Sequence, residues 1–221
     1  GYTRRSNKGV HILNISLDKP EIDGLNSKDT IGSGPDNREE ISYMSLVDSD
    51  VRDHSRLLLN IEDPSYMALD ADKLFVLSSR DEGGVKAYNF DRNREGLRPI
   101  GGVDMLGKAP CHLFFDRDKS LIYASNYHLG RLDILFLNED GLSLAGSICL
   151  EGRGPISPNQ DGPRCHMAIK DPSDRFTLVV NLGGDRVETY YIDTEGYDLV
   201  SSYHTRPGMG PRHMVFGPGG R

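Results

Sequence analysis

Pro163-Arg164-Cys165-His166-Met167 is one of four related pentapeptides in this chain of 221 residues. The others are Asp63-Pro64-Ser65-Tyr66-Met67, Ala109-Pro110-Cys111-His112-Leu113 and Gly210-Pro211-Arg212-His213-Met214. Counted at the fourth position, successive copies lie 46, 54 and 47 residues apart, and that position is histidine in every copy except the first. A nearly constant period of about 50 residues is typical of a repeated supersecondary unit.

Each repeat contains four short apolar runs separated by turn residues. In the middle repeat these runs are 112–115, 121–124, 131–137 and 142–150, with Asp, Asn and Gly between them. The neighbouring repeats give runs at 67–69, 74–78, 85–90, 97–103, 167–169, 176–180, 186–192 and 197–203. Such runs are typical of strands in hairpins, and no sustained helical stripe accompanies them. We therefore predict an all-β fold, a β-propeller of four-stranded antiparallel blades.

The repeats also predict how much of a ring the chain contains. Residues 1–10 align with the end of a second strand, and residues after 211 supply one strand of a further blade. We expect two strands, then whole blades starting near 64, 110 and 163, then one strand, so that residues 1–221 form a partial propeller of about half a ring. Met67, Leu113, Met167 and Met214 are placed on innermost strands. An open arc exposes strand edges, so we expect this segment alone to aggregate or stay partly unfolded and to show little activity.

One segment, about residues 27–56, interrupts the repeat. The interval from the third turn to the next blade is 39 residues here, against 13 from Leu97 to Pro110 and 14 from Tyr197 to Pro211. The segment is rich in acidic residues, namely Asp29, Asp36, Glu39, Glu40, Asp48, Asp50 and Asp53. It is interpreted as a solvated surface insertion or, alternatively, as a lid over the site.

Composition excludes several classes of protein. The net charge is −7 and basic residues are not clustered, which argues against nucleic-acid binding. No apolar run approaches the length of a membrane span. The three cysteines, Cys111, Cys149 and Cys165, form no C-x-x-C pair, which argues against a disulfide framework or a zinc site and favours a reducing compartment. We therefore expect a cytoplasmic protein with neither a metal nor another cofactor.

The repeated histidines indicate a site. Equivalent positions of successive blades face a common axis, so His112, His166 and His213 are expected to meet Arg164 and Arg212 at one face. Histidine can act as a general base near neutral pH, and arginine can hold a carboxylate, a phosphate or an oxyanion. The alternative is structural, with each histidine bonded to neighbouring backbone.

The chain resembles the seven-bladed propeller lactonases of the 6-phosphogluconolactonase type, relatives of carboxy-cis,cis-muconate cyclase. The resemblance covers essentially the whole chain apart from the insertion. Two of the pentapeptides described above carry it, Pro64-Ser65-Tyr66-Met67 and Ala109-Pro110-Cys111-His112-Leu113. The other segments that carry it are Tyr2-Thr3-Arg4-Arg5, Lys8-Gly9-Val10, Asn126-Tyr127, Gly183, Asp185-Arg186-Val187, Gly210-Pro211-Arg212-His213, Phe216 and Gly220-Arg221.

The resemblance implies a seven-bladed ring that hydrolyses a sugar lactone, 6-phosphogluconolactone, to 6-phosphogluconate in carbohydrate metabolism. It implies His166 as the catalytic base and Arg212 as the catalytic oxyanion or substrate clamp. Arg164, as a phosphate partner, joins His112, His213 and Tyr127 as substrate-binding candidates.

The departures from the family pattern limit what can be carried over. Arg164 replaces the first histidine of the usual Pro-His-x-His, and Ser79-Arg80 stands where Asn-Glu is common. The carboxylate of the family site would follow Arg221, and a second arginine would come from a later blade. Only His166 and Arg212 of the family site are therefore carried over by position.

Three other functions remain open. A non-enzymatic interaction scaffold is disfavoured because the chain has no tryptophan and hence no Trp-Asp signature. A calcium-dependent lactonase could use Asn126 and Asn181, which end equivalent strands, although no axial carboxylate accompanies them. A cyclase or isomerase could use the same site, because ring closure and ring opening share an oxyanion. The sequence specifies neither the lactone nor the oligomeric state.

Overall fold

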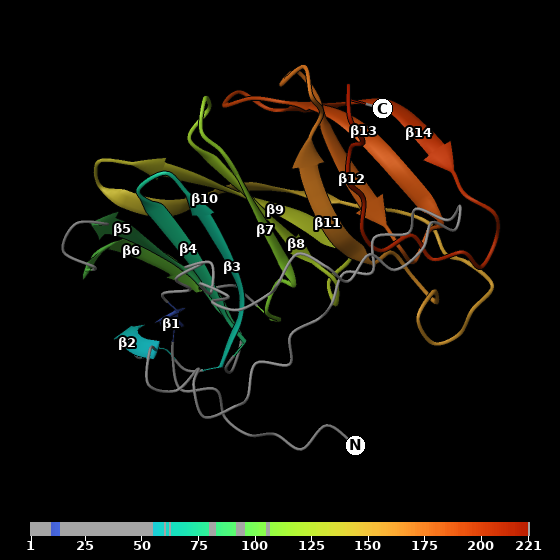
Figure 1. Ribbon diagram of the computed structural model, residues 1–221. Coiled ribbons are helices and arrows are strands. Elements are labelled where there is room, and N and C mark those ends of the chain that lie inside the picture. Colours follow the sequence, from blue (N-terminus) through green and yellow to red (C-terminus); the bar gives the residue numbers. More distant parts are fainter. Residues whose placement is uncertain are drawn as a thin grey trace, which may run out of the picture. The chain divides into compact units, whose positions relative to one another are not determined.

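The structure is a computed structural model that describes residues 10–13, 55–59, 61, 63–79, 83–91, 96–104 and 107–220 (Figure 1). The chain divides into two units, His11–Leu57 and the remainder, and the three sheets described below belong to the larger unit. A separate two-stranded sheet pairs β1 (Val10–Leu13) with β2 (Ser55–Leu59). The predicted acidic insertion lies outside the described residues, apart from its last two positions in β2.

Three four-stranded sheets follow one another along the chain. The first contains β3 (Pro64–Asp70), β4 (Lys73–Ser78), β5 (Gly84–Asp91) and β6 (Gly96–Asp104). The second contains β7 (His112–Asp116), β8 (Leu121–Asn126), β9 (Arg131–Asn138) and β10 (Gly141–Cys149). The third contains β11 (Cys165–Lys170), β12 (Thr177–Asn181), β13 (Arg186–Ile192) and β14 (Tyr197–His204).

In each sheet the strands pair in chain order and run antiparallel, which confirms the predicted all-β fold of four-stranded units. The first strands β3, β7 and β11 contact one another in turn, and the last strands β6 and β10 also contact each other. Figure 1 shows this order as teal, green and orange sheets side by side. This is the arrangement of successive propeller blades, with β3, β7 and β11 innermost.

The described residues include no helix that is long and apolar enough to cross a membrane.

The prediction that Met214 lies on an innermost strand is wrong for this structure. Residues 205–220 form turns and irregular backbone. A strand needs a ladder of hydrogen bonds to a partner, and no described segment pairs with residues 211–216 in that way. Met214 instead donates its backbone N–H to the sulfur of Met167 on β11, at 3.3 Å. This contact brings the segment that carries Arg212 and His213 against the third sheet.

The apolar core lies between the sheets. One cluster joins the first two sheets and contains Phe75, Leu77, Val85, Ala87, Leu113, Ile122, Ala124, Leu135 and Leu142. Another joins the second and third sheets and contains Leu121, Tyr123, Leu132, Ile134, Ile148, Leu150, Cys165, Ala168, Val179, Tyr190 and Ile192. Alternate residues of β8 therefore enter different cores, which explains why its sequence is a short apolar run rather than an alternating one and why every residue of β8 is buried.

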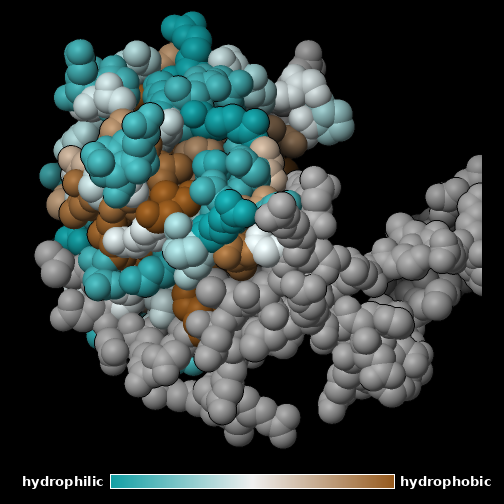
Figure 2. Space-filling model, turned by 90° about the vertical axis from the view of Figure 1, so that its left-hand side faces the viewer, coloured by the Kyte–Doolittle hydropathy of each residue, from teal (hydrophilic) through white to brown (hydrophobic). Residues whose placement is uncertain are grey.

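The outer faces of the first and third sheets are more exposed than the faces between sheets. On the third sheet, every residue of β14 is exposed, and Tyr203 and Leu199 retain 70% and 57% of their accessible surface. On the first sheet, Leu69 of β3 is also exposed. Figure 2, which views the molecule from the side of β5 and β6, shows apolar surface patches bordered by hydrophilic residues.

Glycines after the second strands β8 and β12 allow both turns to approach the segment that leads into β11. A Cβ on Gly130 would lie 2.6 Å from the carbonyl oxygen of Pro163, and one on Gly183 would lie 1.9 Å from that of Gly162. No side chain can be accommodated at such distances. These turns therefore press directly against the segment that leads into β11, and they fix the start of that strand.

Candidate functional site

Two of the predicted histidines lie at the starts of neighbouring inner strands. His112 is the first residue of β7 and His166 is the second residue of β11, and both side chains are buried. His166 is the extra residue of a β-bulge, because Cys165 pairs with Asn181 while Met167 pairs with Val180. A bulge redirects a side chain and is common beside functional sites.

Arg212 makes the central contact of the site with His166. The Nε atom of Arg212 donates a hydrogen bond to Nε2 of His166 at 2.8 Å. An imidazole nitrogen can accept only when it carries no proton, so His166 is neutral and its proton lies on Nδ1. The two Nη groups of Arg212 are not used in this bond. The arginine is exposed, so these groups can bind an anion.

His213 and Tyr127 pack against the same imidazole. The ring centroids of His213 and His166 are 5.0 Å apart at 90°, and those of Tyr127 and His166 are 5.8 Å apart at 79°. The guanidinium of Arg164 lies over the ring of Tyr127, 5.4 Å from its centroid. An Nη group of Arg164 also donates to the carbonyl oxygen of His128 at 3.3 Å. Arg164, on Tyr127, and Arg212, on His166, therefore flank the pair of rings that Tyr127 and His166 form.

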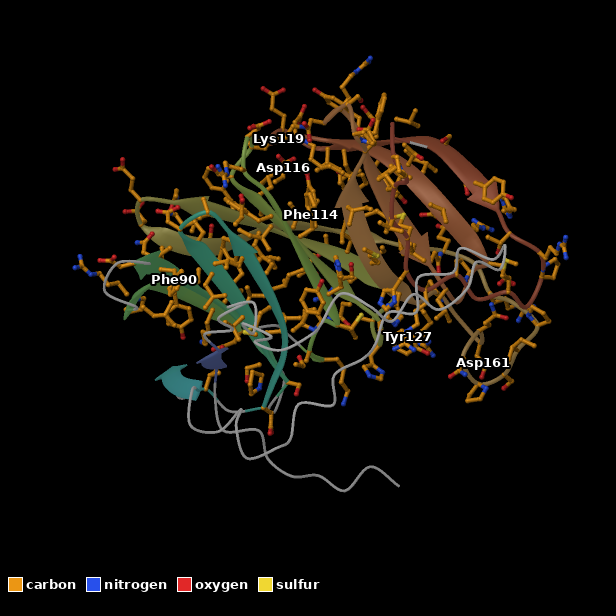
Figure 3. The ribbon with its side chains drawn as sticks, viewed as in Figure 1. Phe90, Phe114, Asp116, Lys119, Tyr127 and Asp161 are labelled. Atoms are coloured by element: carbon orange, nitrogen blue, oxygen red, sulfur yellow. The ribbon has the colours of Figure 1, made fainter. Side chains whose placement is uncertain are left out.

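His112 lies at the margin of this cluster. Its ring packs against Tyr66, the residue that replaces histidine in the first repeat, with centroids 4.8 Å apart. It also interacts electrostatically with His166 and His213. All six predicted site residues are thus found at one end of the sheets, and Figure 3 shows one of them, Tyr127, at the end opposite Asp116 and Lys119. The roles predicted for these six residues stay predictions.

Burial and mutual repulsion keep both inner histidines neutral. Burial lowers the pKa of His112 to about 4, and the positive forms of His213 and His166 would lower it further. Burial also lowers the pKa of His166 to about 4, with additional contributions from the charge of Arg212 and from His213. A neutral His166 agrees with its role as hydrogen-bond acceptor for Arg212.

These pKa shifts predict a loss of stability in mild acid. In the unfolded chain both histidines bind a proton near pH 6.5, whereas in the folded protein they bind one only near pH 4. Between these values the unfolded state holds more protons, so the free energy of unfolding decreases as the pH falls. The decrease is up to about 1.4 kcal/mol per pH unit for each histidine. Urea unfolding from about pH 7 to about pH 5 measures it.

The matched control for this prediction is the double variant His112→Gln, His166→Gln. It lacks both titrating groups, so its free energy of unfolding should vary less with pH over the same window. Equal pH dependence in the wild-type protein and the double variant would contradict the assignment.

Two residues that the sequence did not assign to the site, Asp185 and Gln160, hold the chain that leads to Arg212. The carboxylate of Asp185 accepts hydrogen bonds from the backbone N–H groups of Gly208 at 2.7 Å and Gly210 at 2.8 Å, and from Nε2 of Gln160 at 2.7 Å. Burial of Asp185 opposes ionisation, but these bonds outweigh it and lower the pKa of the carboxyl group. Asp185 contributes to the family resemblance, but its hydrogen-bond partners were not predicted.

Asn126 and Asn181 act as structural residues in this structure. The Oδ1 atom of Asn126 accepts the backbone N–H of Leu129, and that of Asn181 accepts the N–H groups of Gly184 and Arg164. Their amide oxygens, which the calcium hypothesis would need as ligands, are therefore engaged by backbone groups. Within the described ranges, no group of three or more His, Cys, Asp or Glu residues is arranged to hold a metal ion.

Comparison with known proteins places the chain in a family. Residues 29–221 match the family model described as "Lactonase, 7-bladed beta-propeller". The chain is 30% identical over 168 residues to the 6-phosphogluconolactonase of Bacillus subtilis, covering 74% of this chain and 48% of that protein. It is 27% identical to an uncharacterized protein of Lactococcus lactis subsp. cremoris, covering 100% of this chain and 56% of the relative.

A solved structure of a protein from Lactobacillus plantarum superimposes with a TM-score of 0.67 at 32% identity, covering 74% of this chain and 48% of that one. The chain therefore belongs to the seven-bladed β-propeller lactonase family. It spans about half the length of the curated relatives that it matches.

Proposed function

We propose that the protein hydrolyses a sugar lactone and that its substrate is 6-phosphogluconolactone. Family membership and the name of the Bacillus subtilis relative support this proposal. The observation that carries it is the contact between Arg212 and His166, which holds a guanidinium at the inner-strand end of the sheets with its Nη groups unused by that bond. Such a preorganised cation is suited to stabilising the negative charge of a tetrahedral intermediate.

The proposed reaction needs only water and side chains of this cluster. A histidine removes a proton from water while the water oxygen forms a bond to the lactone carbonyl carbon. The carbonyl oxygen becomes an oxyanion, which the Nη groups of Arg212 stabilise. The intermediate then collapses, the bond from this carbon to the ring oxygen breaks, and the ring oxygen receives the proton. The product is the open-chain acid.

Arg164 is proposed to bind the substrate phosphate. Its guanidinium is oriented by the ring of Tyr127 and the carbonyl oxygen of His128. Its buried Nε atom has no hydrogen-bond partner among the residues that the structure describes. A planar guanidinium with unused donors is suited to a phosphate group.

The substrate can be tested by replacing Arg164 in the full-length protein. Arg164→Ala should raise the KM for 6-phosphogluconolactone by about 10- to 100-fold, because a hydrogen bond to a charged group is worth about 1.5–3 kcal/mol. The kcat should change much less, because a phosphate contact of equal strength in the ground state and the transition state contributes only uniform binding. The measurement compares steady-state hydrolysis of 6-phosphogluconolactone and gluconolactone.

Gluconolactone, which lacks the phosphate, serves as the control substrate. An equal loss on both lactones would contradict the phosphate role of Arg164. Absence of hydrolysis of either lactone by the wild-type protein would contradict the proposed function itself.

A further inference from the structure

The hydrogen bond between Arg212 and His166 restricts what His166 can do in catalysis. A general base needs an unprotonated nitrogen that can reach the attacking water. The unprotonated nitrogen of His166 is Nε2, and this atom already accepts the Nε–H of Arg212 at 2.8 Å. The other ring nitrogen, Nδ1, is buried and carries the proton. Neither nitrogen is therefore available as a proton acceptor for water in this arrangement.

His213 lies in a different situation. Its side chain is exposed, and no hydrogen bond to a described residue occupies its ring nitrogens. It follows Arg212 directly in the sequence, and its ring meets that of His166 edge-on at 5.0 Å. A base on His213 and an oxyanion donor on Arg212 would be carried by one segment, which Asp185 holds at Gly208 and Gly210.

We infer that His166 is a positioning residue that orients Arg212 and that His213 is the residue that takes the proton from water. The inference rests on the proposed lactone hydrolysis. The proton of the attacking water moves to a ring nitrogen of His213 as the carbon–oxygen bond forms. The oxyanion is held by Arg212, and the ring oxygen takes the proton back from His213 when the lactone bond breaks.

The charged and titratable groups around His166 and His213 are consistent with a positioning role for His166 and a base role for His213. Arg212 and His213, on the segment after β14, face His166. Tyr127, after β8, packs against the ring of His166, and His112 on β7 interacts electrostatically with both histidines. The thiol of Cys111 donates to the backbone carbonyl oxygen of His166 at 3.4 Å, and burial raises its pKa to about 11, so it stays uncharged. The positive neighbour of His166 thus favours its neutral form.

The first test does not depend on lactonase activity. In ¹⁵N-labelled full-length protein, NMR should show His166 as the tautomer with its proton on Nδ1, and the Nε–H of Arg212 should exchange slowly with solvent. His166→Ala should abolish that protection. His166→Gln should retain it, because the glutamine oxygen can accept the same hydrogen bond. A His166 proton on Nε2, or an Arg212 signal unaffected by His166→Ala, would overturn the positioning role.

The second test compares pH–rate profiles. His213→Gln should lower kcat by about 10²–10⁴-fold and remove the acid limb of the profile, since it removes the base. His166→Gln should stay within about tenfold of wild type and keep the acid limb, because it preserves one hydrogen bond. The reverse pattern would make His166 the base and overturn the inference. If the wild-type protein hydrolyses no lactone, the proposed function and the base role fail together, while the NMR result still decides the role of His166.

Discussion

Replacing Arg212 with alanine is expected to lower kcat/KM for lactone hydrolysis by about 10²–10³-fold, the usual effect of losing one oxyanion donor. The structure places the Nε atom of Arg212 on His166, which leaves the Nη groups for substrate. Because these groups would bind the developing charge, the loss should appear in kcat rather than in KM alone. Steady-state kinetics on 6-phosphogluconolactone measures the effect.

Two further variants test whether the loss of activity is specific to the guanidinium of Arg212. Arg212→Lys keeps the positive charge but loses the planar fork that contacts His166 and substrate together, so it should recover only part of the activity. Arg117→Ala removes another exposed arginine, which pairs with Asp70 at the far end of the inner strands, and should leave turnover within about twofold of wild type. Similar losses in the Arg212→Ala and Arg117→Ala variants would contradict a catalytic role for Arg212.

Replacing Asp116 with alanine is expected to destabilise the protein by about 3–5 kcal/mol, because it leaves the charge of Lys170 buried without a partner. The Nζ atom of Lys170 on β11 lies 3.1 Å from a carboxylate oxygen of Asp116 on β7, and the two side chains are 6% and 1% exposed. The hydroxyl of Tyr123 also donates to Asp116 at 3.1 Å. Urea unfolding monitored by circular dichroism measures the change.

The preceding blade offers a matched control. Asp70 is the last residue of β3, as Asp116 is of β7, and it accepts a hydrogen bond from Nε of Arg117 at 2.8 Å. This pair is much more exposed, with 59% of the arginine side chain accessible, so Asp70→Ala should cost only about 0–1 kcal/mol. Equal costs at the two positions would show that burial of the Asp116 pair does not determine its contribution.

The sequence predicted the fold well because the same pattern of strands and turns occurs in each repeat. Four apolar runs per period, each bounded by turn residues, correspond to the strands β7–β10 and to their counterparts in the neighbouring sheets. The exception, Met214, shows the limit of this reasoning. Its apolar run has the composition of a strand, but β structure also requires a hydrogen-bonded neighbour, and composition does not report one.

The proximity of the candidate residues was predicted from the sequence, but their contacts with one another were not. The shared position of His112, His166 and His213 in the repeat was enough to place them together. The bulge at His166 and the hydrogen bond from Arg212 were not predictable, because both depend on local register and on the path of an irregular segment. Burial, which lowers the pKa of His166, is likewise a property of the packed sheets.

The hydrogen bonds that Asp185 accepts from Gly208 and Gly210 join parts of the chain on either side of the β13–β14 hairpin. The carboxylate and the two glycine N–H groups that it binds are separated by a short stretch that includes β14. Arg212 follows, in the sequence, every strand of the sheet that carries His166, so its contact with His166 requires the chain to fold back past that sheet. The position of the Arg212 guanidinium therefore depends on the turn after β14 as well as on the sheet that carries His166.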